Sequence, residues 1–395
     1  MSYKLIALGD ICTITGGGTP SKSNPSFYEG DIYWATVRDM SNDVLSETDF
    51  KISIEAVKES STNIIPKGNV VIATRVGLGK VCILNQDTAI NQDLRGVTPK
   101  NVNQLDVKYL FYWFKSISQK IIDAGRGATV HGVTLPFIKS LEIPLPSLAT
   151  QQKIVAKLDA VFAEIDKAVL ATEANVKNAE SLFKSYLFEV FEQGGSEWID
   201  KKLTDVAIYM GRGKSKHRPR NDASLYGGEY PFIQTGDVRN CDKFITNYTQ
   251  TYNEKGLAQS KLWKANTVCI TIAANIAEIG ILGFDACFPD SVIGVVVDKE
   301  KVSEDFLYLM LLFAQQRIKD KSKGSAQENI NLATFEDMLF KVAPLNQQKI
   351  IIEKFNNLKI STDFVHESNL KKMNELLNLK NSILKQAFNG ELVKD

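Results

Sequence analysis

Cationic side chains gather in glycine-rich stretches of the chain. A basic run at 211–220 contains no acidic residue and holds Arg212, Lys214, Lys216, Arg218 and Arg220. A flexible cationic segment of this kind can neutralise phosphate groups and release their counterions. Nearer the N-terminus, the stretch Gly16–Lys22 carries Thr19 and Lys22 among small residues. In both stretches the small residues would let backbone N–H groups approach a phosphate. The competing interpretation is a solvated surface loop.

Other side chains in turn-like stretches could contact base edges. Arginine suits a bidentate contact with guanine, and asparagine or glutamine suits one with adenine. Candidates in the first half are Arg38, Arg75, Lys80, Asn91, Gln92, Arg95, Arg126, Thr129 and His131. Candidates in the second half are Gln234, Lys323, Ser325, Gln327 and Asn329. For each of these residues taken singly, a surface role competes with a base contact. The strand-like context of Trp34, Phe232 and Trp263 predicts core positions instead.

The sequence carries no recognisable catalytic motif. Gly77–Val81 lacks the upstream glycine and the Ser/Thr of a P-loop, and no Gly-x-Ser-x-Gly elbow is present. The three histidines are dispersed, which disfavours a His/Cys metal site. A single Ser or Cys nucleophile and a Mg²⁺ site of two carboxylates stay open. We predict a non-catalytic protein without a metal or cofactor of its own.

Composition predicts an ordinary globular protein. The 395 residues are 44% hydrophobic and 24% charged, with a net charge of +1, so any affinity for nucleic acid must come from charge gathered on one face. The longest apolar runs are far too short to span a bilayer. Five dispersed cysteines and the lack of a signal-like N-terminus favour a reducing, cytoplasmic location.

The chain repeats itself along its length. Leu8–Ile11 is matched by Leu203–Val206, and Gln151–Ile154 is matched by Gln347–Ile350, with the intervening segments in the same order. We predict a tandem duplication of a mixed α/β domain (α+β class) followed by a long helix. The predicted boundaries are 1–150 and 194–346 for the globular domains, and 151–193 and 347–395 for the helical segments.

The long helices are expected to pair. Gln151–Gln193 contains neither proline nor glycine, and its seam residues, Val161 and Leu182 among them, recur in steps of four and three. At about 1.5 Å per residue it makes a rod of roughly 64 Å. Gln347–Asn389 has an equal span, with Leu379 in its seam. An antiparallel coiled coil would bury both seams and relate the halves by a pseudo-two-fold axis. The alternative is two amphipathic helices, each packed on its own domain.

Three motifs and their order carry a family resemblance. They are Gly-Gly-Gly-Thr-Pro-Ser-Lys at Gly16–Lys22, Gly-Ala-Thr-x-x-Gly-Val-Thr at Gly127–Thr134, and Ile-Pro-Leu-Pro-x-Leu-x-x-Gln-Gln-x-Ile at Ile143–Ile154. With the repeat, the chain resembles the DNA specificity subunits of type I restriction–modification systems. The resemblance implies two target-recognition domains, each binding one half of a bipartite, asymmetric double-stranded DNA site.

The resemblance also implies partners. The helix pair would set the gap between half-sites and dock two modification subunits, which bind S-adenosylmethionine and methylate adenine. Restriction subunits with an ATP-dependent motor would join this complex, whose role is defence against foreign DNA.

The second half departs from the family pattern in two places. Its loop Gly211–Lys216 has the sequence Gly-Arg-Gly-Lys-Ser-Lys in place of Gly-Gly-Gly-Thr-Pro-Ser-Lys, and Ala273–Ile279 has no arginine to match Arg75. We interpret this as a different base preference in the two halves. Three alternatives stay open: the recognition subunit of a related system whose partner both methylates and cleaves, a coiled-coil interaction protein without a DNA role, and an unrecognised enzyme.

Overall fold

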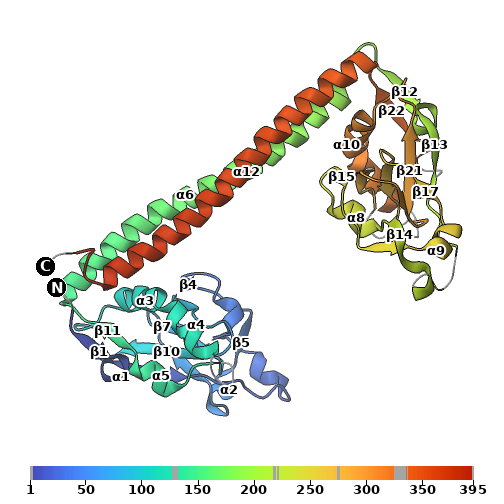
Figure 1. The fold of residues 1–395 in the computed structure, drawn as a ribbon. Coiled ribbons are helices and arrows are strands. Elements are labelled where there is room, and N and C mark those ends of the chain that lie inside the picture. The colour runs from blue at the N-terminus through green and yellow to red at the C-terminus, as the bar shows by residue number, and fades with distance from the viewer. Residues whose placement is uncertain are drawn as a thin grey trace. The chain divides into compact units, whose positions relative to one another are not determined.

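The computed structural model describes residues 3–126, 132–216, 219, 222–273, 276–323, 335 and 337–393, without the side chains of 126 and 320–323. The chain divides into two compact units. The first unit comprises Met1–Glu173 with Leu370–Asp395, and the second comprises Ala174–Asn369. Each unit contains a mixed α/β globular part and a stretch of paired long helices (Figure 1).

The globular part of the first unit is built around two packed sheets. Its strands are β1 (Leu5–Ala7), β2 (Cys12–Gly16), β3 (Ile32–Ala35), β4 (Val44–Leu45), β5 (Phe50–Ile52), β6 (Asn63–Ile65), β7 (Val70–Ala73), β8 (Val81–Leu84), β9 (Thr88–Ile90), β10 (Leu94–Pro99) and β11 (Glu142–Pro144). One sheet has the order β2-β10-β7-β8-β4 and the other β5-β3-β9-β6, while β1 pairs with β11. The chain passes from one sheet to the other through residues 91–93, between β9 and β10.

Helices pack against both sheets. They are α1 (Leu8–Ile11), α2 (Ile54–Lys58), α3 (Val107–Ser116), α4 (Ser118–Arg126) and α5 (Leu135–Ser140). Strand β7 is apolar and buried at every position, as expected of a strand covered on both faces. Helix α3 begins at Asp106, whose carboxylate accepts a hydrogen bond from the Tyr109 backbone N–H, and it buries six consecutive residues from Tyr109 to Phe114. Val70 and Ile72 of β7 share one hydrophobic core with these residues of α3.

The second unit repeats this construction. Its strands are β12 (Ile199–Lys202), β13 (Ala207–Arg212), β14 (Tyr226–Phe232), β15 (Phe244–Ile245), β16 (Gln250–Tyr252), β17 (Leu262–Trp263), β18 (Val268–Thr271), β19 (Ile279–Leu282), β20 (Ala286–Cys287), β21 (Val292–Val297) and β22 (Leu339–Val342). Its helices are α7 (Leu203–Val206), α8 (Thr235–Asn240), α9 (Glu254–Ala258) and α10 (Glu304–Lys323).

Sheet orders in the two units correspond strand by strand. The second unit has β13-β21-β18-β19-β15, β16-β14-β20-β17 and the pair β12-β22. Registers also correspond, because Trp34 pairs with Phe50 and Ala89, while Phe232 pairs with Gln250 and Cys287. This confirms the predicted tandem repeat of mixed α/β domains. Trp34, Phe232 and Trp263 are buried, so their predicted core positions are confirmed as well.

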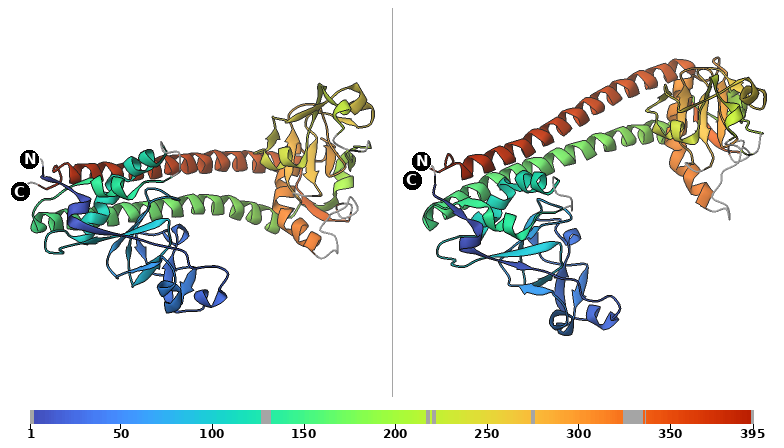
Figure 2. Two further views of the ribbon diagram at one scale, coloured as in Figure 1. Left: turned by 90° about the horizontal axis from the view of Figure 1, so that it is seen from below. Right: turned by 60° about the horizontal axis from the view of Figure 1, so that its bottom comes forward.

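Two long helices run through both units. Helix α6 spans Leu148–Phe188 and ends in a π-helical turn at Glu189–Gln193, and α12 spans Leu345–Phe388. In the first unit, Lys380 of α12 bonds Asp166 of α6 at 2.6 Å. In the second unit, the ring of Phe183 lies 4.4 Å from that of Phe355. Early residues of each helix thus meet late residues of the other, and the antiparallel pairing is confirmed (Figure 2).

The predicted seam is wrong at several positions. Val161 and Leu182 are 37% and 55% exposed, whereas the next residues along α6, Phe162 and Phe183, face α12. On α12, Leu379 is exposed and Lys380 takes the inward place, with its Nζ 4.9 Å from the Phe162 ring centroid. A straight helix has about 3.6 residues per turn and drifts by roughly 20° per heptad from a strict 3.5 repeat. At these positions the inward residue is therefore the next one along the helix, whereas Ile154, Leu158, Ile165 and Thr172 are buried as predicted.

A buried glutamine joins each long helix to its globular part. Gln151 Nε2 donates to the carbonyls of Gln104 (2.9 Å) and Pro146 (3.0 Å), and its Oε1 accepts from the Asp106 N–H at 2.9 Å. Gln348 does the same with the carbonyls of Lys301 and Ala343 and the N–H of Ser303. The equivalent glutamines are thus Gln151, the first of its Gln-Gln-Lys-Ile motif, and Gln348, the second of its own, so the predicted match of Gln151–Ile154 with Gln347–Ile350 is wrong by one residue.

We expect Tyr112→Phe to weaken the contact between α3 and α6 in a pH-dependent way. Asp159 of α6 accepts from Tyr112 Oη at 2.5 Å and from Lys108 Nζ at 2.9 Å. Burial alone would raise the pKa of Asp159, but these two bonds outweigh it and hold the pKa below its ordinary range. A carboxylate with a lowered native pKa stabilises the fold above its unfolded pKa, and this stability is lost as the pH falls through the native pKa.

The measurement is the thermal unfolding midpoint at neutral pH and near pH 3. The midpoint of Tyr112→Phe should fall at neutral pH, and the difference from the parent chain should shrink in acid. Tyr209→Phe, at an exposed tyrosine of the second unit, is the control. A deficit of the same size at both pH values would contradict the argument.

Candidate nucleic-acid interface

Four loops of the first unit meet at one edge of its sheets. They follow β2, β3, β7 and β9 and enclose an open cavity of about 510 Å³. Residues from all four line it, including Lys22, Thr36, Val76 and Asn91. The loops are tied together by backbone bonds, as from the Gly18 N–H to the Ile90 carbonyl (3.0 Å) and from the Thr74 N–H to the Asp93 carbonyl (2.8 Å). Chain segments far apart in sequence thus form one rim.

The rim of this cavity is cationic and its interior is aromatic. Lys22 and Arg38 line the cavity and are exposed. The exposed Lys80 adjoins it, since its Nζ donates to the Val37 carbonyl at 3.3 Å, and the half-exposed Arg75 lies 3.8 Å from the Asp93 carboxylate. In the interior, the ring of Trp34 lies 5.9 Å from that of Tyr28 and 6.5 Å from that of Phe50, both edge-on. Exposed cations beside aromatic rings are suited to phosphate and base contacts.

Local capping presents Arg38 to solvent. The Asp39 carboxylate accepts from the Thr36 N–H at 2.7 Å, and Thr36 Oγ1 accepts from the Arg38 N–H at 3.3 Å. These bonds fix a short 3₁₀ turn at Val37–Asp39, in which Arg38 projects outward. Because the backbone of Arg38 is already fixed, its guanidinium can bind a ligand with a smaller loss of conformational entropy.

Two candidates from the sequence serve the loop at 91–95 instead. Arg95 lies in β10, and its Nη1 donates to the carbonyls of Gln92 (3.0 Å) and Leu94 (2.8 Å). Burial lowers the pKa of Arg95, and the neighbouring Arg75 adds to this. Asn91 is buried, and its amide bonds the Asp93 side chain and N–H. Gln92 is exposed at the loop tip, where its amide contacts the Thr19 hydroxyl.

The expected phosphate cradle of backbone N–H groups is wrong at two glycines. The Gly18 N–H donates to the Ile90 carbonyl and the Gly213 N–H donates to the Val292 carbonyl. A Cβ on Gly213 would lie 2.2 Å from the Phe288 carbonyl oxygen, and one on Gly17 would meet Ile90 equally closely. Gly17 and Gly213 let the loop pass close to the neighbouring backbone, and the N–H groups of Gly18 and Gly213 are already used.

The second unit has a cavity at the corresponding edge. It measures about 750 Å³ and is lined by Ser215, Ala223, Tyr226, Gly227, Phe232, Gln234, Thr235, Gln250, Pro289 and Ser291. The described first residues of the basic run at 211–220 pass along this cavity, because the lining residue Ser215 lies between the exposed Lys214 and Lys216. Arg212, at the end of β13, is exposed, and its Nε donates to the Asp290 carbonyl at 2.7 Å. Cations therefore flank this cavity as well.

Several predicted site residues cannot be placed. Thr129, His131, Arg218, Arg220, Ser325, Gln327 and Asn329 lie outside the described residues. Arg126 and Lys323 end helices α4 and α10, and the structure does not describe their side chains. Conversely, the sequence analysis missed Phe50 and Gln250, which line the two cavities. Each opens a three-residue strand that ends in a buried residue, but a single sequence does not show which residue lies opposite it in the sheet.

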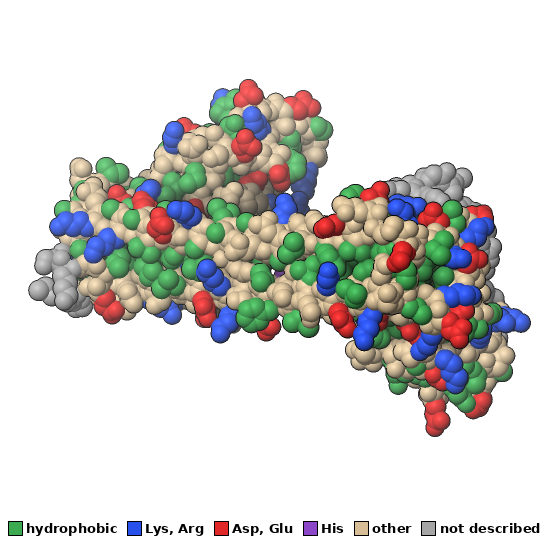
Figure 3. Space-filling view, turned by 90° about the horizontal axis from the view of Figure 1, so that it is seen from above, with side chains coloured by type: hydrophobic (Ala, Val, Ile, Leu, Met, Phe, Trp, Pro, Cys, Tyr) green, Lys and Arg blue, Asp and Glu red, His purple; other side chains and the backbone are tan. Residues whose placement is uncertain are grey.

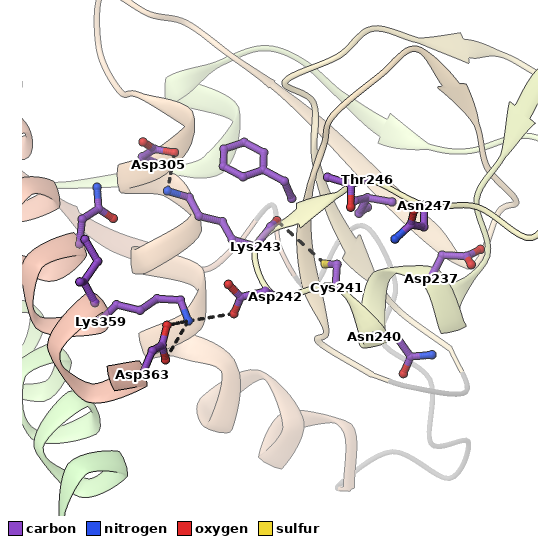
Figure 4. A pocket seen from close by; sticks show the side chains of 14 residues that line it. Asp237, Asn240, Cys241, Asp242, Lys243, Thr246, Asn247, Asp305, Lys359 and Asp363 are labelled. Atoms are coloured by element: carbon purple, nitrogen blue, oxygen red, sulfur yellow. Dashed lines mark hydrogen bonds and ion pairs between the residues drawn. The ribbon is translucent and has the colours of Figure 1, made fainter. Parts of the chain in front are cut away.

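A larger cavity, about 950 Å³, lies in the second unit between residues 240–247 and α12 (Figure 4). Lys359 Nζ bonds the carboxylates of Asp242 (3.0 Å) and Asp363 (3.1 Å), and Lys243 bonds Asp305 at 2.9 Å. Both lysines of its lining are thus paired. These ion pairs hold α12 against the globular part. Because both lysines are already paired with carboxylates, the cavity is poorly suited to phosphate.

The described part of the chain offers neither a cluster of metal ligands nor a membrane-spanning helix. Among those residues, no group of three or more His, Cys, Asp or Glu side chains could hold a metal ion. None of the described helices is both long and apolar enough to cross a membrane.

Comparison with known proteins gives consistent matches. A sequence model of the type I restriction modification DNA specificity domain matches residues 2–172 and again 195–374. The type I restriction enzyme MjaIX specificity subunit of Methanocaldococcus jannaschii is 26% identical over 97% of this chain and 92% of its own length. The EcoR124I/EcoR124II specificity subunit of Escherichia coli is 34% identical over 38% of this chain and 39% of its own.

Solved structures share the fold. A chain from a type I restriction–modification system aligns with a TM-score of 0.77 at 19% identity, covering 99% of this chain and 98% of that one. The HsdS subunit from Thermoanaerobacter tengcongensis aligns with a TM-score of 0.61 at 18% identity, covering 99% and 97%.

Proposed function

The chain belongs to the type I restriction modification DNA specificity family, which each of its halves matches in turn, and from this premise we propose that it is the non-catalytic DNA specificity subunit of a type I restriction–modification complex. Each globular part binds one half of a bipartite, asymmetric site. The observation that carries the proposal is a cavity with cationic flanks, built at the corresponding edge of both units.

The long helices supply a docking surface for two modification subunits and set the gap between half-sites. Large apolar side chains are exposed along them (Figure 3). Ile360 and Phe364, one helical turn apart on α12, are 68% and 72% exposed, and residues at this spacing share one helix face. Exposed apolar surface of this kind marks protein interaction sites. S-adenosylmethionine belongs to the modification subunits and ATP to the motor subunit that joins them, and this chain needs no cofactor.

Selection from a random double-stranded DNA library tests the proposal. We expect the chain, assembled with its modification subunits, to enrich DNA that carries two short fixed blocks separated by a gap of constant length. Methylation of the enriched DNA should fall on adenines within those blocks and depend on S-adenosylmethionine. Enrichment without any shared sequence would overturn the proposal. If Arg38→Ala with Arg75→Ala left the enrichment unchanged, the edge of the first unit would not be the DNA-binding surface; a complex that binds no DNA at all would favour an interaction protein without a DNA role.

A further inference from the structure

Three equivalent positions around the two cavities hold different side chains. The first pair is Thr36 and Gln234, since the N–H of each donates at 2.7 Å to a carboxylate three residues on. Two residues further along are Arg38 and Gly236. The third pair is Phe50 and Gln250, which occupy the same register opposite Trp34 and Phe232. The second unit therefore carries two amides where the first carries a hydroxyl and a phenyl ring.

The two amides of the second unit are already paired. Gln234 Nε2 donates to Gln250 Oε1 at 2.7 Å, and both side chains line the cavity. Gln234 is held by the bond from its backbone N–H to Asp237, and Gln250 is held in β16. Gln250 is exposed and Gln234 is partly exposed, so a ligand in the cavity can reach the pair. The pair is both positioned and accessible.

An amide pair of this kind presents one acceptor next to one donor. When one amide nitrogen donates to the other amide oxygen, the pair still offers a carbonyl oxygen on one residue and an N–H on the other. This holds for either orientation of the two amides. In the major groove, adenine presents the N6 donor beside the N7 acceptor, whereas guanine presents two acceptors. Adenine is therefore the base whose edge matches the pair.

We propose that the Gln234–Gln250 pair reads an adenine in the half-site bound by the second globular part. This rests on the proposed function. The first unit cannot do the same, because Phe50 has no polar atom, while the donors of Arg38 suit guanine O6 and N7. Equivalent edges of the two units would then read different bases.

The test uses the chain assembled with its modification subunits and the site selected by the parent complex. Gln234→Leu and Gln250→Leu should each lower the preference for one adenine, in one half-site only, by roughly tenfold to a hundredfold. Arg38→Ala should act in the other half-site. Asn247→Leu is the matched control, because Asn247 is an exposed amide of the same globular part that does not line this cavity.

A second variant keeps the test independent of folding. Gln250→Glu replaces the free N–H by an oxygen, so the pair presents two acceptors, and acceptors suit cytosine N4. We expect the preference at that position to shift from adenine toward cytosine, which a misfolded protein could not produce. An unchanged preference in all Gln variants, or an equal loss of affinity for every sequence, overturns the inference but leaves the proposed function intact. A parent complex that selects no sequence overturns both.

Discussion

Gln151→Leu is expected to destabilise the first unit strongly. The change removes a fully buried amide that satisfies the carbonyls of Gln104 and Pro146 and the N–H of Asp106. A buried polar group left without a partner costs about 1–3 kcal/mol, so three such groups should cost about 3–5 kcal/mol, allowing for some relaxation. Leucine has a similar volume, so the loss comes from the hydrogen bonds and not from a cavity.

The measurement combines calorimetry with amide hydrogen exchange over residues 104–116. The Asp106 N–H and the first turn of α3 should lose protection, because the amide fixes the segment that begins this helix. Gln152→Leu is the control, since Gln152 is the neighbouring residue and is exposed. Gln348→Leu should behave like Gln151→Leu, with its effect in the second unit. Equal stability of the Gln151 and Gln152 variants would contradict the role assigned to the buried amide.

The repeat could be predicted from sequence because it is a property of the order of residues. Matching segments such as Leu8–Ile11 and Leu203–Val206 fold into the same short helices, α1 and α7. The antiparallel sense of the helices followed from the same repeat. The helix seam could be predicted only in part, since a single-residue shift of the buried stripe depends on which neighbours fill it. Lys380 lies inward because Phe162 and Asp166 are there to receive it.

The site was less predictable, because its geometry depends on contacts between segments that are far apart in the sequence. Cationic loops such as those containing Lys22 and Arg38 are visible in the sequence, and the structure brings them to one rim. The glycines of these loops were misinterpreted because close approach to another backbone segment requires glycine in the sequence just as close approach to a phosphate does. The pairing of Gln234 with Gln250 depends on the register of β14 and β16, which no local pattern specifies.

Replacing the four cations of the first rim by alanine is expected to have the largest effect on DNA binding. The residues are Lys22, Arg38, Arg75 and Lys80. Each phosphate contact contributes about 0.9 to the slope of log affinity against log salt. If all four contact phosphates, the slope should fall by roughly 3.6 and the affinity at 0.1 M salt by on the order of a thousandfold. Both quantities come from binding titrations of the assembled complex at several salt concentrations.

The slope separates the contributions of the four side chains more sharply than the affinity does. If Arg38 contacts a base, the slope should fall by about 2.7, for three phosphate contacts, while selectivity in one half-site also declines. Alanine at four exposed lysines outside the rim, Lys4, Lys67, Lys120 and Lys153, removes the same charge and should change the slope little. If both quadruple variants lowered the slope equally, only net charge would matter. The rim would then have no special role, because a localised interface requires that the position of the charge decides its effect.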